Sequence, residues 1–306
     1  MTHHHSHTDN HVHADCNQTD QNITRLSIVL GVTALYMFIE FLGGLWINSL
    51  ALLADAGHML TDIGAIGLAL FAAWFSKQPC SSQKTYGYYR LEILVALING
   101  VALALISFFI LYEAFVRIQH PLQIKAGALI WIATGGFILN LISASILFKS
   151  GQQNLNIRSA LFHVLSDSLG TLGTVIAGIA IYFWNFYQAD PILSIVIALL
   201  VLVNGWKIIQ EATNILLEAC PVHLSVADIE SALTDLHEIR SVHDLHVWSI
   251  TSGKEALSVH LVVEDTEHYT PDLVMKVQQV LKEKFGLTHL TVQLETPDFE
   301  EDSIHF

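Results

Sequence analysis

The stretch LADAGHMLTDIGA, which begins at residue 53, places three ionisable side chains, Asp55, His58 and Asp62, in a mostly apolar run. Residues four apart lie on one face of a helix, so His58 and Asp62 project together. The run HVLSD repeats this pair as His163 and Asp167. A charged group at membrane depth costs at least ~2.5 kcal/mol. Because each of these two matched pairs would incur that cost, they indicate a functional site.

The chemistry of these four side chains suits a metal ion. Two imidazole nitrogens and two carboxylate oxygens fill the tetrahedral shell that Zn²⁺ prefers, and the carboxylates cancel its charge. Four protein ligands leave no position for a reacting water, which favours carriage or structure over catalysis. Nitrogen and oxygen donors without thiols suit zinc, cobalt or cadmium better than magnesium or Cu(I). The alternative is a set of buried polar groups that satisfy one another without metal.

Asp55 lies on the same helical stripe, three residues before His58. It is an outer ligand, a gate or a proton site, or else a residue near a helix end at the polar interface. The spacing leaves these roles open.

Composition predicts the elements that hold the pairs. The 306 residues are 52% hydrophobic and 14% charged, with a mean hydropathy of +0.49. Such a chain is expected in a lipid bilayer. Helices of about 20 residues cross its hydrocarbon core, and six runs qualify: 25–46, 50–75, 91–117, 124–148, 157–184 and 191–210.

The basic residues predict the orientation of these six transmembrane helices. Seven Lys and Arg fall on one side of the membrane and two, Arg117 and Lys125, on the other. Because basic residues favour the cytoplasmic side, both termini are expected in the cytoplasm, with the protein in the cell (inner) membrane. The first side carries Arg25, Lys77, Lys84, Arg90, Lys149, Arg158 and Lys207.

Three domains are expected: a His-rich disordered cytoplasmic tail (1–24), a transmembrane domain (25–211), and a cytoplasmic metal-binding and dimerisation domain (212–306). The last has 17 Asp and Glu against 5 Lys and Arg, so it is a poor binder of nucleic acid. Its patterns predict the order α-β-β-α-β, an α+β ferredoxin- or metallochaperone-like form. Residues 3–13 hold six histidines, which collect metal loosely or form a solvated tail.

The segments LADAGHMLTD, YGYYRLE and DLHVWS, in this order, resemble the cation diffusion facilitator family of zinc transporters, bacterial zinc exporter type, over about residues 25–295. The resemblance implies a homodimer that exports divalent metal in exchange for protons by alternating access. It implies a transport site of His58, Asp62, His163 and Asp167, whose first pair is the version associated with zinc preference. It also implies a charge interlock, which matches Arg90 and Glu218; an arginine that merely follows the positive-inside rule is the alternative.

The resemblance places a second zinc site in the tail domain, at His246, His260 and Glu295, with His243 a weaker candidate. Alternation along the strands agrees, since it puts His246, His260 and Glu295 on the sheet face opposite the apolar residues. Gln293 departs from relatives that carry a histidine there, so the number of metal ions stays open. Surface histidines without metal are the alternative.

The sequence is thus interpreted as a homodimeric exporter of Zn²⁺, with Cd²⁺ or Co²⁺ as further substrates, driven by protons across the lipid bilayer. It is interpreted as a secondary transporter, not an enzyme. A membrane-anchored metal sensor or buffer is the main rival, and only a transporter needs two facing pairs within the membrane. A membrane metalloenzyme would need an open coordination position and a substrate cleft, which the sequence does not indicate.

Overall fold

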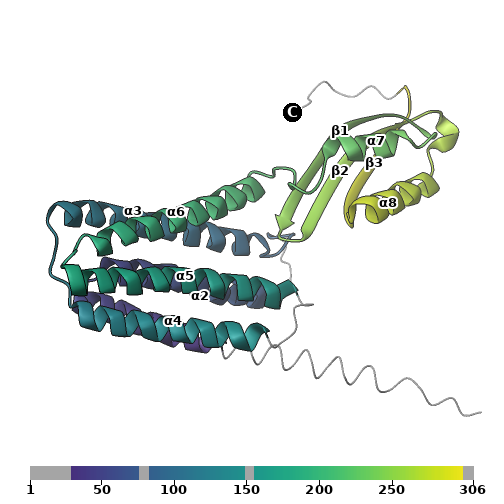
Figure 1. Ribbon diagram of the computed structural model, residues 1–306. Helices are drawn as coiled ribbons and strands as arrows, with labels where there is room; N and C mark the ends of the chain where they lie inside the picture. The colour runs from purple at the N-terminus through teal and green to yellow at the C-terminus, as the bar shows by residue number, and fades with distance from the viewer. Residues whose placement is uncertain (1–28, 76–82, 149–154, 299–306) are drawn as a thin grey trace, which may run out of the picture. The chain divides into compact units, whose positions relative to one another are not determined.

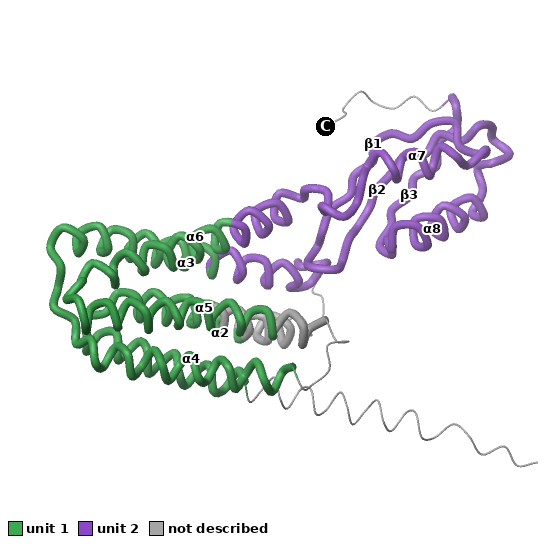
Figure 2. The backbone as a smooth tube through the Cα atoms, in the orientation of Figure 1, with its two compact units in different colours: residues 1–67, 99–206 green, residues 68–98, 207–306 purple. Residues whose placement is uncertain are grey.

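The computed structural model describes residues 29–75, 83–148 and 155–298 (Figure 1), with the backbone alone at 62, 65–66, 68–75 and 155–160. The expected His-rich tail, 1–24, lies outside the described residues. The chain forms two compact units, residues 1–67 with 99–206 and residues 68–98 with 207–306 (Figure 2).

Six long helices correspond to the six expected spans. Five are long and apolar enough to cross a membrane, and the second, α2, runs for 26 residues with its side chains described in part. The last of them, α6, continues six residues beyond the expected end at 210 because its pattern stays helical after the apolar run. The bounds are Val29–Ile47, α2 Leu50–Phe75, α3 Arg90–Gln119, α4 Ala126–Phe148, α5 Leu155–Trp184 and α6 Ala189–Leu216.

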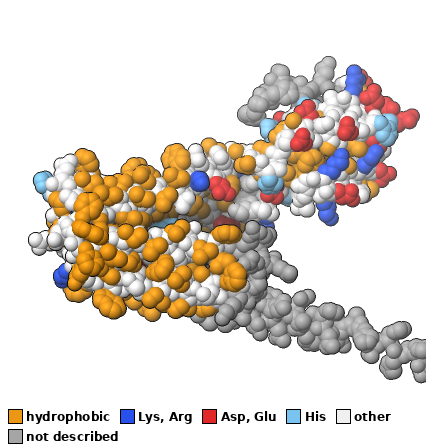
Figure 3. Space-filling model, viewed as in Figure 1, with side chains coloured by type: hydrophobic (Ala, Val, Ile, Leu, Met, Phe, Trp, Pro, Cys, Tyr) orange, Lys and Arg blue, Asp and Glu red, His pale blue; other side chains and the backbone are white. Residues whose placement is uncertain are grey.

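Large apolar side chains point outward from these helices. Trp131 on α4 is 80% exposed and Leu169 on α5 is 72% exposed. Figure 3 shows hydrophobic side chains covering the visible face of the helices, whereas acidic and basic side chains gather over the strands and α8. An apolar surface of this extent requires lipid.

Small residues let the helices of the first unit approach closely. A Cβ atom on Gly136 of α4 would overlap the hydroxyl of Tyr36, and one on Gly43 would lie 2.6 Å from Ile132 Cδ1. The Val29–Ile47 helix and α4 therefore pack with side chains of one filling space that a glycine of the other leaves open.

The N-terminus of α2 is capped by a residue from α6. Asp190 is fully buried, and its carboxylate accepts hydrogen bonds from Ser49 Oγ at 2.5 Å, Leu50 N at 2.8 Å and Ala51 N at 3.3 Å. Ser49 Oγ in turn accepts from Leu52 N at 3.3 Å. These bonds satisfy the amide groups that a helix start leaves without intrahelical partners.

The tail domain has the expected order α-β-β-α-β, with one added 3₁₀ turn. Ser225 caps α7, and α8 begins at Pro271 after the Thr270 cap. Gly286 ends α8 with a φ of 72°, a conformation that glycine adopts without strain. The elements are α7 Val226–Thr234, β1 Ile239–Thr251, β2 Lys254–Val263, η1 Thr266–His268, α8 Pro271–Phe285 and β3 His289–Glu295.

The three strands form one sheet in the order β1-β2-β3, antiparallel between β1 and β2 and parallel between β2 and β3. One sheet face packs on α7 and α8. Their apolar residues and those of the strands make a single core of Ile229, Leu233, Ile239, Val247, Leu257, Val259, Leu261, Val263, Leu273, Val277, Leu281 and Leu287.

Candidate metal centre

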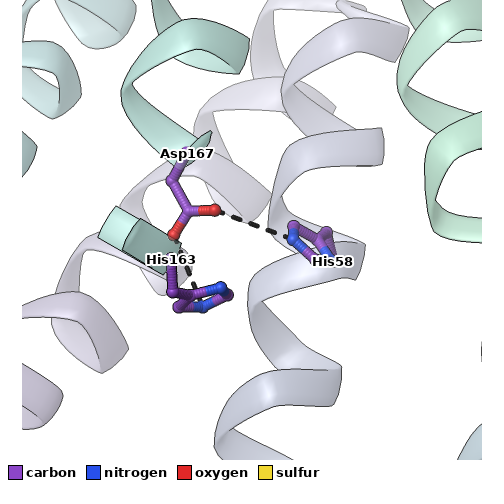
Figure 4. A group of neighbouring side chains, drawn as sticks. All are labelled: His58, His163 and Asp167. Carbon is purple, nitrogen blue, oxygen red and sulfur yellow. Dashed lines mark ion pairs between the residues drawn. The ribbon is translucent and has the colours of Figure 1, made fainter. Parts of the chain in front are cut away.

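Helices α2 and α5 bring three of the four expected intramembrane ligands together (Figure 4). His58 Nε2 lies 3.7 Å from Asp167 Oδ1, and His163 Nε2 lies 3.6 Å from Asp167 Oδ2. The imidazole centroids are 6.0 Å apart, edge to face. We call His58, His163 and Asp167 the helix cluster.

The helix cluster has donor separations close to those of a metal site. One ligand atom from each residue can be chosen so that all lie within 4.8 Å of one another. A tetrahedral ion with ligands at ~2.0–2.1 Å separates its donors by about 3.3–3.4 Å. The two nitrogen-to-oxygen distances above, each to a different oxygen of Asp167, are a few tenths of an ångström longer than this. The widest donor separation, up to 4.8 Å, would have to close further around one ion. The carboxylate between two imidazoles would supply the negative charge.

The other two residues of the opening motif are placed less completely. Asp62 lies on α2, one turn after His58, but its side chain is outside those described, so its part in the cluster stays a prediction. Asp55 is buried, with 4% of its surface exposed. Its role as outer ligand, gate, proton site or helix-end residue near the polar interface remains a prediction.

A second cluster lies on the face of the tail sheet that points away from α7 and α8. His243 Nε2 is 2.8 Å from Glu295 Oε2, and His260 Nδ1 is 2.9 Å from Glu295 Oε1. Glu295 is 4% exposed, and Gln293 Nε2 donates a hydrogen bond to its Oε1 at 2.9 Å. We call His243, His260 and Glu295 the tail cluster.

His246, which the sequence ranks above His243, lies outside the tail cluster. Its Nε2 is 2.9 Å from Asp244 Oδ1, while Asp244 Oδ2 is 3.7 Å from His260 Nε2. Asp244 thus stands between the two histidines. Sequence reasoning missed this carboxylate, although its place between His243 and His246 was a usable signal.

A β-bulge explains the exchange of His243 for His246. His243 pairs with His260, but His246 pairs with Ser258, so β1 contains one residue more than β2 between these pairs. The extra residue puts His243 and His246 on the same sheet face, whereas regular alternation would put them on opposite faces. Asp244 adopts a φ of 49° at the bulge.

Arg90 and Glu218, which the resemblance matches as an interlock, form an ion pair within the second unit. Arg90 Nη2 lies 2.7 Å from Glu218 Oε1. The side chains are 40% and 59% exposed, so water weakens the attraction to at most about 1 kcal/mol. The contact exists, and its role as an interlock stays a prediction.

The comparisons with known proteins all match members of one family. A family described as cation efflux transmembrane domain matches residues 26–217, and cation efflux protein, cytoplasmic domain, matches residues 221–297. The cadmium, cobalt and zinc/H(+)-K(+) antiporter of Bacillus velezensis is 41% identical over 297 residues, which cover 96% of this chain and 94% of that protein.

Zinc transporter ZitB of Escherichia coli K12 is 39% identical over 298 residues, which cover 96% of this chain and 93% of that protein. The solved metal-bound C-terminal domain of the CzcD transporter from "Cuprividus metallidurans" is 38% identical and covers 24% of this chain and 99% of its own, with a TM-score of 0.22. On the family match and the two full-length relatives, the chain belongs to the cation efflux family, the cation diffusion facilitators, and is a membrane transporter rather than an enzyme.

Proposed function

We propose that this protein exports Zn²⁺ from the cytoplasm in exchange for protons, with Cd²⁺ and Co²⁺ as further substrates. The observation that carries the proposal is the helix cluster, in which donors from two separate spans lie within 4.8 Å of one another. The printed names of relatives, a zinc transporter and a cadmium, cobalt and zinc antiporter, support the choice of metals.

The proposed transport site consists of His58, Asp62, His163 and Asp167. An imidazole must be neutral to bind a metal, and imidazoles change charge near neutral pH, so protons compete with metal for these atoms. Because α2 and α5 each supply half of the site, a relative movement of the two helices changes its ligand distances. Alternating access then lets metal enter from the cytoplasm and protons displace it on the other side.

The assembly and placement are part of the same proposal. A domain of the dimer-forming cytoplasmic type supports a homodimer, and bacterial relatives support the inner membrane. Both termini face the cytoplasm by the distribution of basic residues. The proposed domain bounds are 1–24, 25–211 and 212–306.

The tail cluster is proposed as a second metal site that senses cytoplasmic metal. Its carboxylate sits between two imidazoles, and Asp244 links it to His246, so a metal there would draw β1, β2 and β3 together. Gln293 supplies an amide where a histidine would add a ligand, which favours one ion over two.

Zinc uptake by everted membrane vesicles under an imposed pH gradient tests the transport proposal. Asp167→Ala should lower the initial rate at least about tenfold, because it removes the carboxylate between both imidazoles. Ser166→Ala is the matched control, since its exposed hydroxyl bonds the Phe162 carbonyl of its own helix at 3.0 Å.

The same variant separates the transporter from a sensor or buffer. Loss of proton-driven uptake in Asp167→Ala, with zinc still bound in the tail domain of the purified variant, would support the transporter over the sensor or buffer. Unchanged uptake by Asp167→Ala would remove the helix cluster from the transport path.

A further inference from the structure

Glu40 is a buried carboxyl that the proposed metal site does not use. It is the one acidic residue of the Val29–Ile47 helix and is fully buried. Its Oε1 lies 2.6 Å from the Tyr36 hydroxyl, and its Oε2 has no hydrogen-bond partner among the residues that the structure describes. A carboxylate is costly to ionise inside an apolar span when one of its two oxygens accepts no hydrogen bond.

The hydrogen-bond geometry fits a protonated Glu40. The Tyr36 hydroxyl also lies 3.0 Å from the carbonyl oxygen of Ile132 on α4. A phenol has one proton, so it donates fully to only one of these two oxygens. When Glu40 carries a proton on Oε1, Glu40 donates to Tyr36 and Tyr36 donates to Ile132. When Glu40 is ionised, Tyr36 donates to Glu40, and no heavy atom needs to move.

Two features show that this arrangement is built into the packing. Gly136 of α4 leaves the space that the Tyr36 hydroxyl occupies, because any Cβ there would overlap it. Helix α4 contains no ionisable side chain in its whole length, Ala126–Phe148. The proton on Glu40 therefore has Tyr36 as its hydrogen-bonding partner and no competing base on α4.

Glu40 lies close to the part of α2 that contributes to the helix cluster. Its partner Tyr36 packs in one buried group with Ala56 and Met59 of α2, the residues that directly follow Asp55 and His58 in the chain. Negative charge on carboxylates in this region opposes a further negative charge nearby. A divalent ion held by Asp62 and Asp167 cancels their negative charge and so removes the repulsion that opposes an anionic Glu40, and such effects are strong away from water.

Resting on the proposed function, we propose that Glu40 binds one of the exchanged protons without being a metal ligand. In the metal-free state its O–H bond is intact. When metal enters the helix cluster from the cytoplasm, that bond breaks, the carboxylate keeps the electron pair, and the proton leaves to the cytoplasm. When metal leaves on the opposite side, a proton from that side restores the acid. Zinc and proton thus exclude each other through the field between two sites.

Proton release on zinc binding tests this role. Full-length protein in detergent, carrying His243→Ala and His260→Ala to remove the tail cluster, is titrated with Zn²⁺ in weak buffer containing a pH dye. Glu40→Gln, which keeps the shape but carries no acidic proton, should bind zinc and release about one proton fewer per ion near neutral pH.

The matched control is Glu113→Gln in the same background. Glu113 also lies in a spanning helix, but its Oε1 is paired with Arg117 Nε at 2.8 Å and it belongs to neither cluster. Its proton count should equal that of the background protein. An equal count for Glu40→Gln at every pH would overturn the inference.

Infrared difference spectra of the unmodified chain provide a test that does not depend on the variant folding. Zinc binding should remove the stretching band of a protonated carboxyl, and a spectrum without that loss would overturn the inference. Failure of the proposed function would look different, since the unmodified chain would then show no proton-driven zinc uptake. Failure of this inference alone would leave that uptake intact.

Discussion

At the scale of single residues, Lys276 fixes the charge state of Glu238 in the tail domain. Lys276 Nζ donates a hydrogen bond to Glu238 Oε1 at 2.6 Å, and this bond holds the pKa of the Glu238 carboxyl below its usual range. The Glu238 side chain is 15% exposed. A carboxyl whose pKa is lower in the folded state stabilises that state above its unfolded pKa, and the contribution is lost as the pH falls through the folded pKa.

Lys276→Met should therefore destabilise the tail domain at neutral pH by about 0.5–1 kcal/mol. The difference from the unmodified chain should shrink as the pH falls below the usual carboxyl range, and disappear only below the folded-state pKa of Glu238, where Glu238 is protonated in both folded and unfolded states. Hydrogen exchange of peptides from α8, compared with the unmodified chain at each pH, measures the effect. Lys282→Met on the same helix is the control, and an equal effect from it would contradict the pairing.

Asp244 shows where prediction from the sequence stops. Alternation of apolar and polar residues was enough to predict the strands, their buried face and the position of His260 and Glu295. It was not enough to rank His243 and His246, because a single inserted residue reverses the alternation. The bulge is set by the pairing of β1 with β2. Because that pairing is a contact between two segments, the sequence of β1 carries no sign of the bulge beyond Asp244 itself.

At the scale of elements, the six spans were predictable because length and hydropathy alone decide whether a helix can cross a bilayer. The contacts that fix each helix against its neighbours were not. Asp190 lies 140 residues from Leu50 in the chain, and its carboxylate accepts a hydrogen bond from the Leu50 amide. Nothing in the sequence near either residue indicates that a carboxylate at the start of α6 caps the start of α2.

This cap leads to a prediction for α2, the helix that carries His58. Asp190→Ala would leave buried amides of Leu50 and Ala51 without their acceptor, and one such loss costs about 1–3 kcal/mol. We expect a lower melting temperature in detergent and weaker zinc binding at the helix cluster, because α2 loses the contact that sets its position. Asp190→Asn keeps one acceptor oxygen, so its melting temperature and zinc binding should lie between those of the unmodified chain and of Asp190→Ala. Normal stability of Asp190→Ala would show that water replaces the cap.

At the scale of the whole molecule, the two candidate clusters belong to different compact units. The helix cluster lies in residues 1–67 with 99–206, and the tail cluster in residues 68–98 with 207–306. Helices α2, α3 and α6 each contribute to both units. Metal at each cluster can therefore be removed and measured separately, which a single shared site would not allow.

Removal of metal from the tail cluster should loosen the tail sheet alone. A ligand that binds only the folded state stabilises it by about 2.7 kcal/mol at a hundred times its dissociation constant. We expect a chelator to speed hydrogen exchange in β1, β2 and β3 of the full-length chain, and added Zn²⁺ to reverse this change. His260→Ala should exchange faster and respond to neither treatment, because it lacks a ligand from the central strand. A His260→Ala chain that still responded to zinc as the unmodified chain does would place the metal elsewhere in the tail domain.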